Sequence, residues 1–391
     1  MVKRITALLL AVLMLLSLCA CGATSEGTQT GTQAETAAEP VVSLNPTEQL
    51  SDDAEAMSAE EMAAMGDKYY HGDGVEVDYE TARSWYLKAG EAGYGLAYLW
   101  LGDTYYFPSG ELQDYDKAFE YYSKAAEAGS PDAMGNLGVL YASGRGVEQD
   151  YVQAVQWYEK AMDAGCAWAA RNLGNIYLDG KPGIEQDEEK GLALLYRSVE
   201  MGFTDAYVFI GNYYRYQKND YAEAEACYLK AAEAGNTQAF ASLGGMFLYS
   251  TNDHDKAEMY LLKSAEAGNI DSLVRLGDLY NGYFGSAKRD YAKAVEWYTR
   301  SMEADPPNPY GIYQLAGMYY YGRGVERDYE KAFELYCRSA EIYQESSTDA
   351  GFLPNVLDML EEMYRTGRGV EQDTAKADEL HERSESLKNA P

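Results

Sequence analysis

The sequence predicts an all-α protein in which about nine helix pairs stack as a solenoid. A unit of about 36 residues recurs from about residue 59 to residue 388. Within each unit, apolar residues return at helical spacing in two separate segments. Hydrophobic residues make up 47% of the 391 positions, which is enough to bury a core. Because one helix pair cannot bury its own apolar stripes, we expect the pairs to stack against one another.

Two positions mark the units. In the first half, a glycine recurs at Gly66, Gly102, Gly138, Gly174, Gly211, Gly244 and Gly277, with Ala316 and Glu361 in the last two units. In the second half, an aromatic residue recurs at Tyr86, Tyr122, Tyr158, Tyr196, Tyr228, Tyr260, Tyr298 and Tyr336, with His381 in the last unit. A glycine inside a helix costs about 1 kcal/mol relative to alanine. Its return therefore predicts a place where a neighbouring helix leaves no room for a side chain.

The segment 131–165 shows how one unit forms two helices. Ser130 is suited to the N-cap of the first helix, and Pro131 fits the first helical position, where its missing N–H would have had no partner. Asp150 is expected to cap the second helix. That helix should end where Gly165 can adopt a left-handed conformation.

A Gly-x-Gly-Val turn joins the two helices in four units, starting at Gly72, Gly144, Gly322 and Gly367. Because no strand precedes these turns, we interpret them as helix-to-helix joints and not as phosphate-binding loops. The fifth and sixth units have the segments 217–220 and 251–254 in place of this turn. We expect the local curvature to differ there.

These motifs resemble Sel1-like repeats, which are relatives of tetratricopeptide repeats with a longer interhelical turn. The resemblance rests on the recurring Leu-Gly-x-x-Tyr, Gly-x-Gly-Val, Asp-Tyr-x-Lys-Ala and Ala-Glu-Ala-Gly strings. It implies an α/α superhelical solenoid of antiparallel helix pairs whose usual role is protein–protein scaffolding. Nine repeats are expected over residues 59–388, and the last one, with Glu361 and His381 at signature positions, is degenerate and suits a cap.

The N-terminus has the pattern of a processing signal. Two cations precede an apolar run over residues 5–18, which is too short to cross a bilayer core of about 30 Å. The following Leu18-Cys19-Ala20-Cys21 resembles the lipobox of bacterial lipoproteins, which implies a signal peptide over 1–20 and a lipid on Cys21. The alternative is ordinary cleavage that leaves a free cysteine.

A tether follows the proposed lipidation site. Residues 21–58 lack aromatics and are rich in Thr, Ser, Ala, Gln and Glu, a composition that favours disorder. The chain is therefore expected to be extracytoplasmic and anchored by its lipid to a bacterial cell membrane, with the repeats held away from the bilayer. The remaining cysteines, Cys166, Cys227 and Cys337, are expected to be separate thiols because their placement shows no paired framework.

The charge and the motifs of the chain exclude several classes of function. The chain carries 63 Asp and Glu against 32 Lys and Arg, a net charge of −31, which excludes nucleic acid as a partner because phosphate binding requires a basic face. Three histidines fall in different units without zinc-ligand spacing, so no metal or cofactor is expected. No nucleophile elbow or triad is marked out, and the sequence therefore predicts a protein that is not an enzyme.

A binding groove is the leading functional prediction. In related helical-repeat folds the first helix of each pair lines the concave surface, and the position after the recurring glycine is expected to line it with polar side chains. One turn away on the same face lie aromatic and arginine residues, the types enriched at binding hot spots. The predicted groove residues are Asp67, Asp103, Tyr106, Trp168, Arg171, Asn175, Asn212, Arg215, Asp278, Tyr313 and Tyr320. The alternative is that they only solvate this face or pack between repeats.

The sequence thus favours a membrane-anchored scaffold, expected to be monomeric, that binds a peptide or protein of the cell envelope without catalysis. The membrane contact would be made through the lipid on Cys21. Two other functions stay open: an envelope hydrolase or glycan-binding enzyme on the same helical scaffold, and a solute-capture lipoprotein. The helical pattern disfavours the solute-capture function, because such proteins usually have two α/β lobes.

Overall fold

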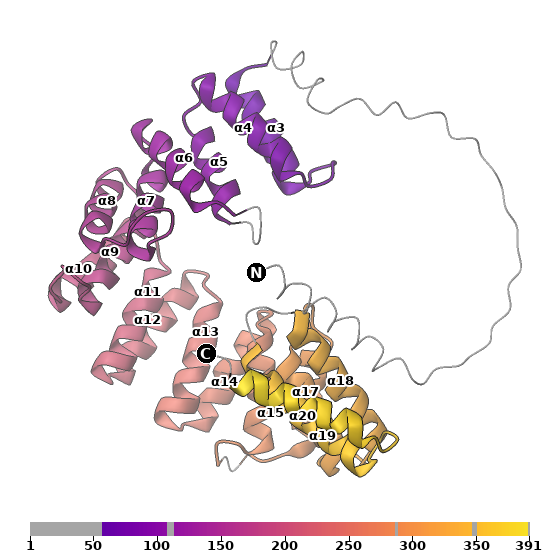
Figure 1. Ribbon diagram of the computed structural model, residues 1–391. Coiled ribbons are helices and arrows are strands. Elements are labelled where there is room, and N and C mark those ends of the chain that lie inside the picture. The colour runs from indigo at the N-terminus through magenta and orange to yellow at the C-terminus, as the bar shows by residue number, and fades with distance from the viewer. Residues whose placement is uncertain (1–56, 108–112, 286–287, 346–349, 390–391) are drawn as a thin grey trace, which may run out of the picture. The chain divides into compact units, whose positions relative to one another are not determined.

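The computed structural model describes residues 57–107, 113–285, 288–345 and 350–389 (Figure 1). Within these ranges every regular element is a helix, which confirms the predicted fold class. The chain divides between Met246 and Phe247, inside the sixth repeat, into two compact units. We call the described residues up to 246 the N-terminal unit and those from 247 onward the C-terminal unit.

The N-terminal unit contains four complete repeats, a fifth with an extra segment, and the first helix of the sixth. Its helices are α3 (Ala59–His71), α4 (Tyr79–Glu91), α5 (Ala97–Tyr106), α6 (Tyr115–Glu127), α7 (Pro131–Ser143), α8 (Tyr151–Asp163), α9 (Ala167–Asp179), α10 (Glu188–Glu200), α11 (Ala206–Tyr213), the π-helix η2 (Tyr214–Lys218), α12 (Tyr221–Glu233) and α13 (Gln238–Met246).

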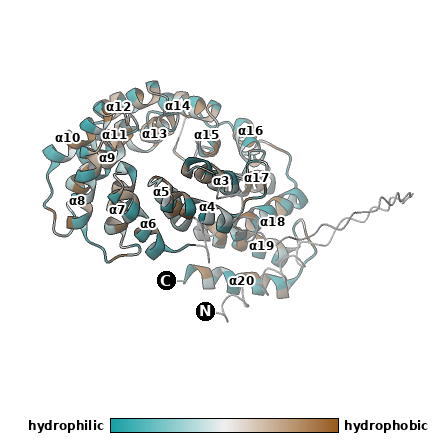
Figure 2. Cartoon of the chain, turned by 90° about the horizontal axis from the view of Figure 1, so that it is seen from above, coloured by the Kyte–Doolittle hydropathy of each residue, from teal (hydrophilic) through white to brown (hydrophobic). Residues whose placement is uncertain are grey.

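The C-terminal unit continues with the same alternation. Its helices are the π-helix η3 (Phe247–Thr251), α14 (His254–Glu266), α15 (Ile270–Asn281), α16 (Tyr291–Met302), α17 (Pro309–Tyr321), α18 (Tyr329–Glu345), the short 3₁₀-helix η4 (Ala350–Phe352), α19 (Leu353–Thr366) and α20 (Thr374–Lys388). In each unit, consecutive helices pack as antiparallel pairs such as α7 with α8 and α17 with α18 (Figure 1). Most helices carry both hydrophilic and hydrophobic residues, as expected when only one stripe is buried (Figure 2).

Aspartates start the second helices, as the sequence predicts. The Asp150 carboxylate accepts hydrogen bonds from the backbone N–H groups of Val152 and Gln153 at 2.8 and 3.0 Å. Ser130 caps α7 with Pro131 in its first turn, and Gly165 follows α8 with a φ of 101°. The same capping bond recurs at Asp78, Asp114, Asp187, Asp220, Asp253, Asp290, Asp328 and Asp373. Each cap supplies an acceptor for N–H groups that have no partner inside the helix.

The recurring glycine makes room for the recurring tyrosine within one helix pair. A Cβ added at Gly138 would lie 2.6 Å from Cε1 of Tyr158, and one at Gly102 would lie 2.6 Å from Cδ1 of Tyr122. Real Cβ atoms do not approach other atoms so closely, so the ring occupies the space that a side chain would need. The prediction of a close approach at this position is confirmed, and at these two glycines the neighbour is a buried ring.

Two aromatic assignments from the sequence were wrong in register. Counted from the capping aspartates, the position of Tyr158 is occupied by Leu195 in the fourth repeat and by Leu261 in the sixth, and both are fully buried. Tyr196 and Tyr260 lie one residue after and one residue before it. In the fourth repeat the helices approach through backbone instead, since a Cβ at Gly174 would lie 2.8 Å from the carbonyl oxygen of Gly191.

The Gly-x-Gly turn also connects neighbouring repeats. Gly144 ends α7 with a φ of 68°, and Gly146 has the same φ. A Cβ on Gly146 would lie 2.2 Å from the carbonyl oxygen of Tyr115, at the start of the second helix of the preceding repeat. Glycine is required there by conformation and by the approach of backbone from the preceding repeat.

In the fifth and sixth repeats the first helices end differently. The π-helices η2 and η3 replace the Gly-x-Gly turn. Asn219 and Asn252 take the left-handed conformation, with φ of 52° and 57°. Asparagine tolerates this region better than most residues.

The predicted signal peptide over 1–20, the lipidated Cys21 and almost all of the 21–58 tether lie outside the described residues. Met57 and Ser58 are the exceptions: Met57 packs against the first repeat, and Ser58 caps α3 through a reciprocal pair of hydrogen bonds with Glu61. Among the described helices, none has the length and apolarity needed to span a membrane. Cys166, Cys227 and Cys337 form no disulfide among the residues that the structure describes.

Candidate functional site

Four of the predicted groove residues accept a hydrogen bond from the buried tyrosine of their own repeat. The Tyr86 hydroxyl donates to Asp67 Oδ1 at 2.7 Å, and the Tyr122 hydroxyl donates to Asp103 Oδ1 at the same distance. The equivalent bonds join Tyr228 to Asn212 and Tyr298 to Asp278, also at 2.7 Å. The polar residue after the glycine therefore satisfies the phenol at the end of a buried ring.

Burial changes the acidity of two of these carboxyl groups. It raises the pKa of Asp103 to about 6, against the opposing effect of the hydrogen bond from Tyr122. It raises the pKa of Asp278 to about 7, opposed by the hydrogen bond from Tyr298 and the charge of Arg275. The cause is desolvation, which disfavours the charged form. Asp278 is only 8% exposed. Its side chain is therefore largely buried.

Two further predicted residues pack inside the protein. Arg215 is buried and donates to the carbonyl oxygen of Gly245 at 3.1 Å. Tyr320 is 4% exposed; its hydroxyl donates to Glu362 at 2.7 Å and accepts from Arg368 at 2.7 Å. Both connect one repeat to the next, which is the alternative that the sequence left open for these positions.

The remaining predicted residues of the first helices are half-buried. The Tyr313 ring contacts Phe352 and Tyr336, with centroids 5.0 and 5.4 Å apart. Asn175 lies on α9, immediately after Gly174. Neither residue is among those that line the pockets described below.

Tyr106, Trp168 and Arg171 do come together. They line one pocket of about 420 Å³ in the N-terminal unit, which we call the α5–α9 pocket. Most of its lining comes from the first helices of three consecutive repeats, α5, α7 and α9. The other lining residues are Phe107, Tyr122, Asn136, Val139 and Asn172.

Trp168 is held in place by a hydrogen bond and by a glycine. Its indole Nε1 donates to Asp132 Oδ1 at 2.9 Å. A Cβ on Gly135 would lie 2.4 Å from Cη2 of the indole, so the ring lies directly over the α7 backbone. Both ends of the indole are therefore fixed, and it forms a rigid wall of the pocket.

The opposite wall is built from tyrosines whose hydroxyl groups are engaged. The Tyr106 hydroxyl accepts a hydrogen bond from Arg145 at 3.0 Å, and its ring lies edge-on to Tyr115 with centroids 5.5 Å apart. Tyr122 is fixed through its bond to Asp103. Phe107 is 65% exposed at the end of α5 and gives the pocket an apolar rim.

Arg171 is the only charged residue among those that line the α5–α9 pocket. Its Cζ lies 4.5 Å from the ring centroid of Phe209, and burial lowers its pKa from the ordinary value. Its Nε is buried and has no hydrogen-bond partner in the part of the chain that the structure describes. A guanidinium has five N–H donors, so Arg171, held by aromatic packing and lining the pocket, can bind an acceptor from outside the protein through its other nitrogens.

The other five lining residues were not predicted from the sequence as groove residues: Phe107, Tyr122, Asn136, Val139 and Asn172. A usable signal exists for the two asparagines, because each stands two residues before the recurring glycine of its repeat. Phe107 carries no such signal, since the first helix ends with other residues in the neighbouring repeats.

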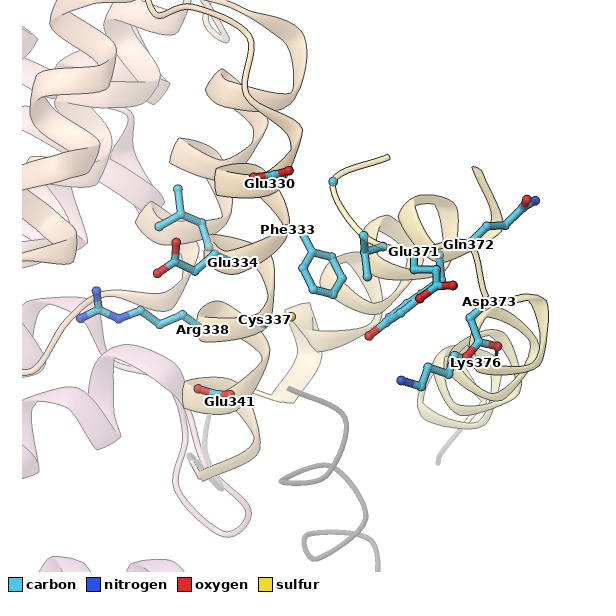
Figure 3. A pocket seen from close by; sticks show the side chains of 14 residues that line it. Glu330, Phe333, Glu334, Cys337, Arg338, Glu341, Glu371, Gln372, Asp373 and Lys376 are labelled. Carbon is cyan, nitrogen blue, oxygen red and sulfur yellow. Dashed lines mark hydrogen bonds between the residues drawn. The ribbon is translucent and has the colours of Figure 1, made fainter. Parts of the chain in front are cut away.

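Other cavities lie in the C-terminal unit. One of them, of about 980 Å³, lies between α18 and the segment that starts α20 (Figure 3). Figure 3 shows Phe333 on the face of α18 that points toward Glu371 and Asp373, and its ring lies edge-on to Tyr364. None of the predicted groove residues lines it. Asp278 lines a third pocket of about 430 Å³ with Asp271, Arg275 and several aromatic rings.

Comparison with protein families decides the classification. The family model of the Sel1 repeat matches nine segments: residues 61–94, 95–130, 131–166, 169–203, 204–236, 241–269, 270–305, 309–342 and 362–388. The chain belongs to the Sel1 repeat family. Its fold is therefore a Sel1 repeat solenoid, the kind of scaffold that typically mediates protein–protein interaction and is generally not enzymatic. Within the described residues, no group of His, Cys, Asp or Glu is placed to hold a metal ion.

Solved structures include other Sel1 repeat proteins. A protective antigen of uropathogenic Escherichia coli with the same repeat fold is 28% identical over 87% of this chain and 79% of its own, with a TM-score of 0.49. A Sel1 repeat protein from Oxalobacter formigenes is 29% identical over 56% of this chain and 92% of its own, with a TM-score of 0.47. Comparison with curated proteins found no match.

Proposed function

We propose that this Sel1 repeat protein is a lipid-anchored scaffold outside the cytoplasm that binds a peptide or protein segment in the α5–α9 pocket. The anchor proposal rests on the apolar run and the lipobox-like string that ends at Cys21. The binding proposal rests on the pocket that joins Tyr106, Trp168 and Arg171. Binding, without chemistry on the partner, is the role expected of a repeat scaffold.

The composition of the α5–α9 pocket is the observation that carries the proposal. Tryptophan, tyrosine and arginine are the residues most enriched at binding hot spots. Here the indole and the phenol ring of Tyr106 are fixed by hydrogen bonds, so little side-chain freedom would be lost on binding. Two asparagine amides, Asn136 and Asn172, lie in the same lining and can pair with a peptide backbone.

Cross-linking in living cells tests the binding proposal. A photo-reactive amino acid is placed at Phe107, on the rim of the pocket, and in a second strain at Val152, which is 43% exposed on the second helix α8. We expect a discrete cross-linked partner from position 107 and none from position 152. The same partner from both positions, or none from position 107, would contradict binding at this pocket.

Fractionation tests the anchor proposal separately. The Cys21→Ala variant should lose incorporation of radiolabelled palmitate and move from the membrane fraction to the soluble or secreted fraction. Cys19→Ala is the matched control, and it should keep both the label and the membrane location. If Cys21→Ala stayed labelled and membrane-bound, the lipidation site would lie elsewhere.

A further inference from the structure

The geometry of the α5–α9 pocket leads us to infer that its ligand carries a carboxylate, which pairs with Arg171 while an adjacent apolar side chain packs against Trp168. This inference rests on the proposed function and names the chemical class of the segment that binds. A carboxylate can come from the end of a polypeptide or from an Asp or Glu side chain, and the experiment below separates these sources.

The charge of the pocket selects the ligand. The chain as a whole is strongly acidic, at −31, yet the only charge among the residues lining this pocket is the cation of Arg171. The Nε of Arg171 is buried and has no hydrogen-bond partner within the described residues, and the charge of Asp205 acts on the guanidinium without a direct ion pair. A partly desolvated cation that lacks a direct ion pair is unfavourable, and a carboxylate matches the guanidinium with two parallel hydrogen bonds.

The neighbouring carboxylates do not fill this role. Asp132 accepts the hydrogen bond from Trp168, Asp103 accepts from Tyr122, and Asp205 accepts from Asn236 at 2.7 Å. Each is therefore directed toward a different donor. Asp103 and Asp132 lie beyond the lining residues, where they hold the walls of the pocket, and they limit the ligand to one negative group placed at Arg171.

The side chains that line the pocket indicate which group of the ligand lies next to its carboxylate. Trp168, Tyr106 and the exposed Phe107 ring present apolar surface beside Arg171. A pocket of about 420 Å³ is large enough for one or two residues of a peptide. The fit is therefore to a short segment with a large apolar side chain next to its carboxylate.

Binding of three short peptides to the full chain in detergent tests the inference. The probes are acetyl-Ala-Ala-Phe with a free carboxylate, the same peptide with a C-terminal amide, and acetyl-Asp-Phe-amide. The readout is the indole N–H resonance of Trp168, assigned from the spectrum of the Trp168→Phe variant. We expect a carboxylate-bearing peptide to shift this resonance and to bind about tenfold or more tightly than the uncharged amide.

Variants at Arg171 complete the test. Arg171→Gln should reduce binding of the carboxylate peptide to the level of the amide, and Arg171→Lys should restore it only in part because the paired hydrogen bonds are lost. Arg197→Gln, on the exposed face of α10, makes the same change in net charge and should leave binding unaltered. An unshifted Trp168 resonance in ligand-free Arg171→Gln would show that the pocket is intact.

The possible outcomes separate this inference from the proposed function. A preference for the free C-terminus or for the Asp side chain supports the inference and identifies the source of the carboxylate. Equal binding of all three peptides would overturn the inference of a carboxylate ligand, but the proposed function, binding of a segment at the pocket, would stand. No binding of any peptide together with a partner cross-linked at position 107 would also overturn the inference. If no peptide bound and no partner were cross-linked at position 107, the proposed function would be contradicted as well.

Discussion

Replacing Gly138 by alanine tests the packing that joins the two helices of each repeat. The added methyl group would lie 2.6 Å from Cε1 of the buried Tyr158 ring, so the ring or the helix must move. Such overpacking costs about 1–3 kcal/mol. Alanine also favours the helix by about 1 kcal/mol relative to glycine. The net expectation is a loss of about 0–2 kcal/mol of unfolding free energy in the third repeat.

Gly317 offers a matched control in the eighth repeat. It also lies inside a first helix, but a Cβ there would meet only the Tyr336 hydroxyl, at an ordinary 3.6 Å. Gly317→Ala should therefore gain the helix propensity, about 1 kcal/mol, without a clash. The difference between the two variants, about 1–3 kcal/mol, reports the clash alone because the propensity term cancels.

Hydrogen exchange measured by mass spectrometry is the suitable assay, because stability in a repeat array is distributed among neighbouring units. Peptides from α7 and α8 should lose protection in Gly138→Ala, and peptides from α17 and α18 should gain it in Gly317→Ala. Urea unfolding followed by circular dichroism gives the accompanying change in overall stability. If both variants gained protection equally, the ring would not be confined as described, and the explanation of the recurring glycine would be wrong.

Two further predictions concern a buried carboxyl group and the turn. Because the folded pKa of Asp278, about 7, lies above its ordinary value of 3.8, its contribution to stability is complete below about pH 4 and is lost as the pH rises through 7. Asp278→Asn can still accept from Tyr298 and should be more stable than the unmodified chain at pH 8 by up to about 4 kcal/mol, but equal to it near pH 4. Urea unfolding at the two pH values measures this, and an equal gain at both would contradict it. Gly146→Ala should cost more than Gly74→Ala in thermal melts, since both have positive φ but only Gly146 abuts the Tyr115 carbonyl; equal losses would show that backbone strain alone matters.

Much of the fold could be predicted because the residues that define the repeat act locally. The capping role of Asp150, the helix start at Pro131 and the left-handed Gly165 depend on backbone geometry within a few residues. Counting from such caps would also have corrected Tyr196, since the buried position is fixed by its distance from the start of the helix and is filled by Leu195.

The candidate site could be predicted only in part. Aromatic and arginine residues on the first helices are visible in the sequence, but their partners lie about one repeat away. Tyr106 and Tyr320 each accept a hydrogen bond from an arginine in the turn of the next repeat, but Tyr320 is buried while Tyr106 lines a pocket with Trp168. Helical periodicity gives both tyrosines the same expected face, and only the packing around them decides which one is buried.

The sequence by itself determined that this protein is a chain of nine helix pairs, because caps, turns and apolar spacing act over a few residues and recur in each unit. Tertiary structure alone decided which polar residues on the first helices are exposed. The hydroxyl groups of the buried tyrosines engage Asp103 and Asp278 across the helix pair, whereas the Arg171 guanidinium keeps an unused donor beside Trp168. That distinction depends on contacts between helices, both within one pair and between repeats, which no local pattern specifies.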